Sequence, residues 1–458
     1  MALIREFLLA TQVQVLNKKM RTSYETGRHS VRERDGFDSL DERLLETFCN
    51  QVSGVIKSKS IAAQYQSAKN QGNVAVKDLL STYASTDSQA QKSRRRSLQT
   101  VALKAIDRIS KNEQQHHSTW VPHQVPTMEP LNRWGFPCLD CSPAQLVAHT
   151  TSIFGELGLL QTFNIPVNMM NNFVTEVAAR YNNVPYHNFY HAFSVFQSCA
   201  WFCAKTDKGA QMKSLEKLSM LVASLCHDCG HTGVNNQYTI NHGSELATLY
   251  NDMSPLENMH AWSCFNVMKV ADIFAGLTLV QKSQARSTIV KSILATDMVF
   301  HKQKLEKMSS LTNLDGDFLI EVVLHTMDIG STAHEWPECV RWSRCVAAEF
   351  SAQVALEKES GMAVSTFMDI KNDLDLVRLQ ADFIGYIVLP AFSLLQNYVP
   401  TLNVAVQNLR RNRDMFMRVA RSEIQLPQRS DVDLRLQSYS KNVTIDGVTL
   451  PFASTFSK

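Results

Sequence analysis

The sequence is poor in the residues that interrupt helices. Its 458 residues include only 17 Gly and 13 Pro, and stretches in which Val, Ile or Thr alternate with polar residues are scarce before the last twenty positions. Half-buried strands need that alternation, so little β-structure is expected. Apolar residues recur instead at helical spacing, for example in the stripe Leu215, Leu218, Leu221, Val222 and Leu225. The sequence therefore predicts an all-α protein.

Long apolar runs, a strong net charge and a disulfide framework are also missing. The formal net charge is +3, which favours neither nucleic acid nor a membrane surface as a partner. No run reaches the roughly eighteen apolar residues of a membrane span, and Arg5 and Glu6 interrupt the apolar N-terminus. The ten Cys are scattered through apolar or motif-bearing segments. These absences predict a cytoplasmic protein without a secretory signal.

Composition divides the chain into three parts. We expect residues 1–125 to form a partly helical and partly flexible extension, residues 126–425 a compact multi-helix domain, and residues 426–458 a polar tail. The run Arg94–Ser97 has three Arg before a Ser, which fits a basophilic kinase acting at Ser97, although solvated charge runs of this kind are common. Helices in the extension would also allow a homodimer.

The run CHDCGHTG, at Cys226–Gly233, permits more than one interpretation. Its C-x-x-C pair is compatible with a zinc module, but the other such pair, Cys138–Cys141, lies far away in the sequence and a helical segment separates them. Cys226 also continues the apolar stripe that ends at Leu225, which favours a buried thiol. The second interpretation is a His-Asp dyad followed by a further His.

Histidines and carboxylates recur outside this run. His187 and His191 form one i, i+4 pair and His227 and His231 another, and each pair would share a face if it lay on a helix. Asp328 lies further along the chain. Imidazole and carboxylate ligands can leave open positions on an ion, and two ions that share a carboxylate can clamp a phosphodiester and activate water.

Several segments together resemble the catalytic domain of the class I cyclic nucleotide phosphodiesterases, an HD-type family. The resemblance covers roughly Leu131 to Arg421 and follows the family's motif order. The motifs are YHNFYHAFSV from Tyr186, HDCGHTGVNNQY from His227, SELATLYND and SPLEN between Ser244 and Asn258, LATDM from Leu294, HTMDIGS from His325, and LQADFIGYIVLP from Leu379. The resemblance implies an all-helical catalytic domain that hydrolyses 3′,5′-cyclic nucleotides to 5′-monophosphates.

The resemblance also implies two divalent ions. His191, His227, Asp228 and Asp328 would hold a tightly bound ion, commonly zinc. Asp228 would be shared with a second ion, commonly magnesium or manganese, which is coordinated mostly by water.

Further roles follow from the same motifs. His187 would protonate the ribose O3′, Glu257 would orient His187, and His231 would lie beside the attacking water. Gln380 would bond the purine edge, and Phe383 and Val346 would enclose the base. The complete substrate-binding set would be Tyr186, Gln380, Phe383, Val346, Ile329, Met298 and Ser331.

Four positions depart from the family pattern. Gly230 stands where H-D-x-D-H has its second Asp, Thr232 replaces Pro, Met259 replaces the first His of E-N-H-H, and Ser331 often corresponds to Asn. None of them is an expected metal ligand or the acid, so we expect an active enzyme. A Gln amide can present either edge to a purine, and the motifs resemble cGMP-selective members as much as cAMP-selective ones. We expect a slight preference for cAMP, with dual use close behind.

Two other functions stay open at this point. Another HD-type metal phosphohydrolase would share the dyad and Asp328 but would not need Gln380 and Phe383 together. A weakly active or inactive nucleotide-binding scaffold would instead use its extension to contact partners.

Overall fold

The computed structural model describes residues 130–428, 442–445 and 448–451. The chain divides into two units, Met1–Val121 and Pro122–Lys458, and all described residues lie in the second. Ser97 and the extension expected over residues 1–125 therefore lie outside the described part. The kinase site, the homodimer and the three domain limits stay predictions.

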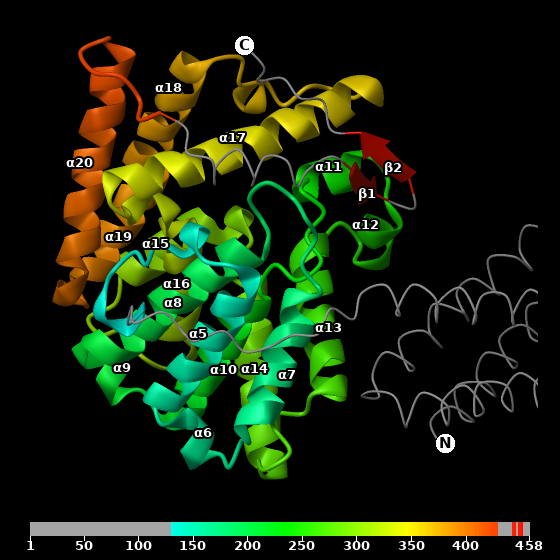
Figure 1. Ribbon diagram of the computed structural model, residues 1–458, viewed down its shortest axis with the longest axis vertical. Coiled ribbons are helices and arrows are strands. Elements are labelled where there is room, and N and C mark those ends of the chain that lie inside the picture. The colour runs from blue at the N-terminus through cyan, green and yellow to red at the C-terminus, as the bar shows by residue number, and fades with distance from the viewer. Residues whose placement is uncertain (1–129, 429–441, 446–447, 452–458) are drawn as a thin grey trace, which may run out of the picture. The chain divides into compact units, whose positions relative to one another are not determined.

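Every element between residues 130 and 428 is helical, which confirms the all-α prediction for this part (Figure 1). The α-helices are α5 (Pro143–Glu156), α6 (Leu159–Thr162), α7 (Val167–Ala178), α8 (Phe189–Lys205), α9 (Asp207–Gln211), α10 (Ser214–Cys226), α11 (Asn236–Asn241), α12 (Glu245–Leu249), α13 (Pro255–Val270), α14 (Leu279–Leu294), α15 (His301–Ser309), α16 (Gly316–Asp328), α17 (Trp336–Glu359), α18 (Asp373–Phe383), α19 (Leu389–Gln396) and α20 (Asn403–Ala420).

Short turns of tighter or wider helix connect these elements. The 3₁₀ turns are Pro130–Asn132, Cys138–Asp140, Met298–Phe300, Ile329–Ala333, Thr366–Met368 and Pro400–Leu402, and Ile384–Val388 is one π-helical turn. In the tail, β1 (Asn442–Ile445) and β2 (Val448–Pro451) form an antiparallel hairpin in which Ile445 pairs with Val448.

Four helices, α8, α10, α14 and α16, pack against one another as the centre of the core. The apolar stripe predicted from the sequence lies on α10, where Leu218, Leu221, Val222 and Leu225 are completely buried. Complete burial of one such side chain stabilises the fold by about 1.5–3 kcal/mol. The start of α8 and the ends of α10 and α16 meet at the same end of this bundle, which brings the sequence motifs together.

Helix α17 packs against the Ile329–Ala333 turn and contacts α18 and α20 (Figure 1). One of its faces carries Trp342, Val346, Glu349 and Gln353 at helical spacing, and Gln353 accepts a hydrogen bond from the backbone N–H of Asn235 at 2.9 Å. The face therefore contacts loops that are distant in the sequence.

One segment, Asp373–Gln396, is long and apolar enough to cross a membrane by length and composition alone. It comprises α18, the π-helical turn and α19. Val377, Ile384, Val388 and Phe392 of this segment are completely buried in the core. Since core helices pass the same test, the segment is weak grounds for a membrane span.

Candidate active site

Four side chains, each in or just after the terminal turn of one of three helices, meet at the end of the bundle described above. His191 lies in the first turn of α8, His227 follows the last residue of α10 and is followed by Asp228, and Asp328 ends α16. One ligand atom from each of the four lies within 4.8 Å of the others. The structure therefore brings together all four residues expected to hold the first ion.

The distances within this cluster fit a cation. The Nε2 atoms of His191 and His227 are 3.2 Å apart, and they lie 3.0 and 3.1 Å from Oδ1 of Asp328. Atoms that coordinate one ion at about 2.1 Å lie about 3.0–3.4 Å from one another. Nδ1 of His227 donates to the carbonyl of Ser224 at 2.9 Å, so Nε2 is the ring atom that a cation in the cluster would meet. Oδ2 of Asp228 is buried there with no hydrogen-bond donor among the described residues.

Neither histidine pair lies within one helix, contrary to the i, i+4 interpretation, although His191 itself is in α8. The side chain of Asn188 accepts the backbone N–H of Tyr190 at 2.9 Å and caps α8, so His187 precedes the helix. Helix α10 ends at Cys226, so His231 lies in the following loop. Local capping, rather than helical periodicity, therefore places these side chains.

His187 is held by a buried carboxylate, that of Glu349 on α17. One oxygen of this carboxylate contacts Nδ1 of His187, and the other accepts the backbone N–H groups of Tyr186 at 2.8 Å and His187 at 3.0 Å. Burial alone would lower the pKa of His187, but the charge and hydrogen bond of Glu349 outweigh it and raise the pKa to about 9. The reciprocal effect lowers the pKa of Glu349 to about 2 despite burial. His187 therefore carries a proton near neutral pH.

Glu257 does not contact His187, so the prediction that it orients this ring is wrong. Glu257 lies in the first turn of α13. Its carboxylate accepts two hydrogen bonds, at 2.8 and 3.2 Å, from the side-chain amide of Asn236. Burial, with a contribution from the charge of Asp297, raises the pKa of Glu257 to about 7. Glu349 already occupies Nδ1 of His187, so no second carboxylate is needed there.

His231 stacks on His187 with ring centroids 4.1 Å apart, and also lies near His260. Burial and the charge of His187 lower the pKa of His231 to about 3, so His231 is neutral. The backbone N–H of Gly233 donates to its Nδ1 at 3.0 Å. The proton of the neutral ring must then lie on Nε2, which makes His231 a hydrogen-bond donor beside the cluster.

The residues expected around the base come from neighbouring elements. Ile329 and Ser331 lie in the turn after Asp328, and this turn packs against α17, which carries Val346. The hydroxyl of Tyr186 donates to Oγ of Ser331 at 3.1 Å. The remaining members are buried Gln380 and half-buried Phe383 on α18, and Met298, which is 43% exposed.

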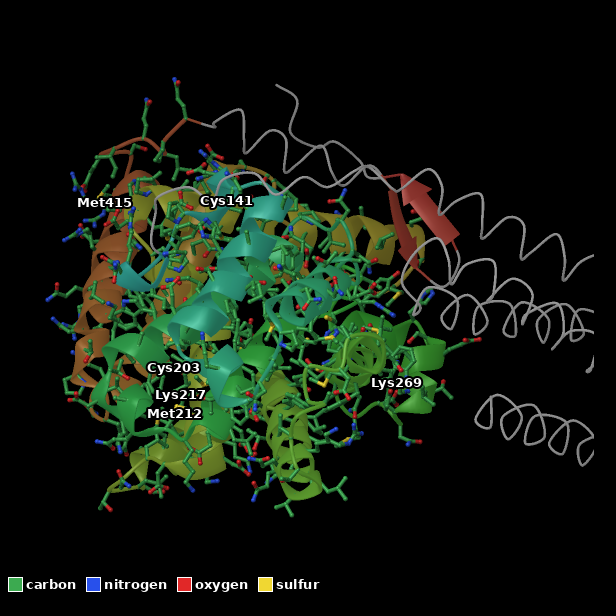
Figure 2. The ribbon with its side chains drawn as sticks, turned by 60° about the horizontal axis from the view of Figure 1, so that its bottom comes forward. Cys141, Cys203, Met212, Lys217, Lys269 and Met415 are labelled. Carbon is green, nitrogen blue, oxygen red and sulfur yellow. The ribbon has the colours of Figure 1, made fainter. Side chains whose placement is uncertain are left out.

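The cysteines of CHDCGHTG are packing residues. Cys226 and Cys229 are completely buried, and no candidate metal cluster among the described residues includes a thiol. Cys203 belongs to the same core; Figure 2 shows it near Lys217, where α8 packs on α10. Burial raises the pKa of the Cys203 thiol to about 12 although Lys217 lowers it. The zinc-module interpretation therefore has no support in the described part of the chain.

Two of the four departures are neighbours in space. Gly230 has a φ of +86°, and a Cβ added there would lie 3.5 Å from Cε of Met259. The two positions at which the resemblance leads us to expect an acid and an imidazole are thus neighbours, and both have lost their polar group. The space beside Gly230 is thus lined by an apolar side chain.

Two residues of this site were missed by the sequence analysis. Glu349 is a lone acid among apolar neighbours in the segment CVAAEF, and a buried acid of this kind needs a partner. That pattern was a usable signal. His260 directly follows Met259 in the sequence, and its Nε2 lies 3.6 Å from Oδ1 of Asp228.

Comparison with known proteins supports the same family. The family model described as 3′5′-cyclic nucleotide phosphodiesterase matches residues 186–409. A high affinity cGMP-specific 3′,5′-cyclic phosphodiesterase 9A of Drosophila melanogaster is 34% identical over 58% of this chain and 18% of its own length. A cGMP-specific 3′,5′-cGMP phosphodiesterase 3 of Dictyostelium discoideum is 31% identical over 60% of this chain and 61% of its own length.

Solved structures agree with these relatives. The phosphodiesterase domain of a rhodopsin phosphodiesterase from Salpingoeca rosetta superposes with a TM-score of 0.62 at 29% identity, and the match covers 68% of this chain and 95% of that one. The chain thus spans nearly all of a phosphodiesterase domain but less than two thirds of the curated relatives' lengths. The comparisons thus show that residues 186–409 are similar to the catalytic domains of class I 3′,5′-cyclic nucleotide phosphodiesterases.

Proposed function

We propose that the protein hydrolyses a 3′,5′-cyclic nucleotide to the 5′-monophosphate and so ends a cyclic nucleotide signal. The contact between His187 and Glu349 beside the four-residue cluster carries the proposal. It places a protonated imidazole near a site suited to a cation. Phosphodiester hydrolysis needs these two features, because charge on the phosphoryl oxygens must be neutralised and the leaving oxygen protonated.

His191, His227, Asp228 and Asp328 would hold one divalent ion, for which the mixed imidazole and carboxylate set favours zinc. Oδ1 of Asp228 faces a second position, where magnesium or manganese would suit. Bound divalent ions neutralise phosphoryl charge and make water a stronger nucleophile.

The protein's own residues supply the proton transfer and its geometry. His187 would donate a proton from Nε2 to the ribose O3′, while Glu349 at Nδ1 stabilises the charged ring. His231 presents an N–H to an oxygen at the reacting phosphate. Tyr186, fixed by Ser331, would border the base together with Gln380.

For the base, we propose that cGMP is used at least as well as cAMP. Oγ of Ser331 accepts the hydroxyl proton of Tyr186, so its own proton is free for an acceptor such as guanine O6. Relatives named cGMP-specific and one named dual specificity also favour guanine, against the slight preference for cAMP drawn from the sequence.

Turnover of cAMP and cGMP with added Mg²⁺ or Mn²⁺ tests the proposal. We expect hydrolysis of both, with the higher kcat/KM for cGMP. A folded, metal-loaded protein that hydrolyses neither would contradict it and favour the scaffold, while hydrolysis of nucleoside monophosphates alone would favour another HD-type phosphohydrolase.

A further inference from the structure

The loop that carries His231 is anchored on two sides. On one side, the side-chain amide of Asn182 donates to the carbonyls of Gly230 and His231 at 3.1 and 3.0 Å. On the other side, Asn235 and Gln353 of α17 exchange two hydrogen bonds. The backbone N–H of Asn235 donates to Oε1 of Gln353 at 2.9 Å, and Nε2 of Gln353 donates to Oδ1 of Asn235 at 3.2 Å. The orientation of one amide group therefore helps to fix this loop.

Gln353 can hold Asn235 in only one of its two amide orientations. If the amide turned over, Nε2 would face the backbone N–H of Asn235, and Oε1 would face Oδ1 of the same residue. Gln353 is 1% exposed, so water could not readily relieve the opposed donors and the opposed acceptors. A neighbouring group that selects the amide orientation therefore stabilises the loop.

Glu357, one helical turn further along α17, is such a group. Its Oε1 accepts a hydrogen bond from Nε2 of Gln353 at 2.8 Å and another from the hydroxyl of Ser365 at 2.8 Å, while its Oε2 accepts the backbone N–H of Ser365 at 2.7 Å. Burial alone would raise the pKa of this carboxyl, but the hydrogen bonds from Gln353 and Ser365 outweigh burial and lower the pKa. Because an ionised carboxylate can only accept, it requires Nε2 of Gln353 on its side and leaves Oε1 for Asn235.

The Ser365 end of this network belongs to a different part of the site. Ser365 lies in the segment between α17 and α18, and α18 carries Gln380 and Phe383, which are expected at the base. Glu357 thus joins the loop that carries His231 to the segment that leads into the helix with the expected base-binding residues.

We propose that Glu357 is a positioning residue for His231, which it places by fixing the amide of Gln353 and, through it, the loop at Asn235. The inference rests on the proposed function, in which His231 presents an N–H to the reacting phosphate. Among the described residues, the hydrogen bonds of Glu357 go to Gln353 and Ser365 and to no member of the four-residue cluster. Loss of the carboxylate should therefore act on kcat through the loop, and leave the tightly bound metal in place.

The test compares Glu357→Gln with the wild type in the full-length protein. The new side chain has an NH₂ group in place of one carboxylate oxygen, so in either orientation an N–H of Gln353 or Ser365 faces another donor. We expect kcat to fall by about 10–100-fold, because a small displacement of a positioned group can cost that much in rate. KM and metal content should stay near their wild-type values. Backbone amides of residues 229–235 should exchange hydrogen faster, as measured by mass spectrometry.

The matched control is Glu359→Gln, which makes the same charge change at an exposed acid of the same helix. It should leave kcat and hydrogen exchange unchanged. Glu357→Asp keeps the charge but shortens the reach toward Gln353, so it should show a smaller change in the same direction. It also decides the matter if Glu357→Gln fails to fold, since wild-type kcat and exchange in Glu357→Asp would then overturn the inference.

The remaining outcomes separate the inference from the proposed function. A folded Glu357→Gln with wild-type kcat, with a lower kcat but unchanged exchange in the loop, or with loss of the tightly bound metal would overturn the inference alone, provided that the wild type turns over. A folded, metal-loaded wild type without turnover would overturn the inference and the proposed function together.

Discussion

A carboxylate oxygen of Glu349 contacts Nδ1 of His187 across a separation of 162 residues. The same carboxylate also holds the backbone of His187 and Tyr186, so it fixes the position of the ring as well as its charge. Because Glu349 sets the pKa of His187, the pH dependence of turnover should report on the contact between these two residues.

Glu349→Gln should lower kcat by about 100-fold and change the alkaline limb of the rate profile. The pKa of His187 is raised to about 9, so its proton-donating form predominates below that pH and is lost as the pH rises through it. Without the charge of Glu349, burial lowers this pKa, and the limb should move down by about 1–3 pH units. The pH dependence of kcat measures this shift.

Glu257→Gln is the matched control, because Glu257 bonds Asn236 rather than His187. Its alkaline limb should stay near pH 9 whatever happens to the rate. If instead Glu257→Gln moved the limb and Glu349→Gln left it in place, the original sequence assignment would be restored.

His187→Ala should lower turnover by about 10²–10⁴-fold and leave the content of tightly bound metal nearly intact. The reason is that His187 contacts Glu349 and lies outside the four-residue cluster. Kinetics combined with elemental analysis separates the two effects. Extensive metal loss would mean that His187 supports the ion rather than donating a proton.

Asp328→Ala should reduce bound metal itself. Its Oδ1 is 3.0 Å from His191 Nε2 and 3.1 Å from His227 Nε2, and is one of the four clustered ligand atoms. We expect the tightly held ion to be lost on dialysis against a chelator under conditions in which the wild type retains it. Elemental analysis checks this, and unchanged metal content would refute the role of Asp328 as a ligand.

Ser331→Asn should shift the ratio of kcat/KM values toward cAMP. An Asn side chain offers an acceptor to the adenine amino group, whereas the Ser331 oxygen already accepts from Tyr186 at 3.1 Å. A change of about tenfold in the cAMP to cGMP ratio is expected from one exchanged hydrogen bond. Tyr186→Phe serves as the comparison, since it frees that oxygen without adding an amide. An identical ratio in the wild type and Ser331→Asn would remove Ser331 from base selection.

Gly230→Asp should destabilise the protein by about 1–2 kcal/mol, because the φ of +86° is costly for a residue with a Cβ and the new carboxylate meets apolar Met259. Met259→His in the same chain should recover part of this loss by supplying a partner. Urea unfolding of both single variants and the double variant gives the coupling energy. Strictly additive effects would show that the two positions do not interact.

The sequence predicted the residues that are close in the chain or that sit in strong motifs. The stripe on α10 follows from apolar spacing, and the four ligand residues follow from the motifs that carry the resemblance. Neither apolar spacing nor a motif indicates which residue from another part of the chain will contact a given side chain. Glu257 was therefore chosen for His187 on motif grounds, whereas packing of α17 brings Glu349 to the ring.

Helix periodicity failed at the site for a similar reason. Spacing alone cannot tell where a helix starts, and the cap formed by Asn188 places His187 before α8. His231 likewise falls beyond the end of α10. Tautomers were also out of reach, because they depend on backbone groups such as the carbonyl of Cys229 that only the folded chain supplies.

One face of helix α17 carries residues that contact several parts of the site. Glu349 accepts a hydrogen bond from the backbone N–H of His187, and Gln353 accepts one from the backbone N–H of Asn235. Val346 would border the base. A small tilt or shift of α17 would therefore change proton transfer, nucleotide selectivity and the position of the loop at Asn235 together. Substitutions that loosen the packing of α17 at a distance should therefore change kcat and nucleotide preference together, as a mechanically linked pair.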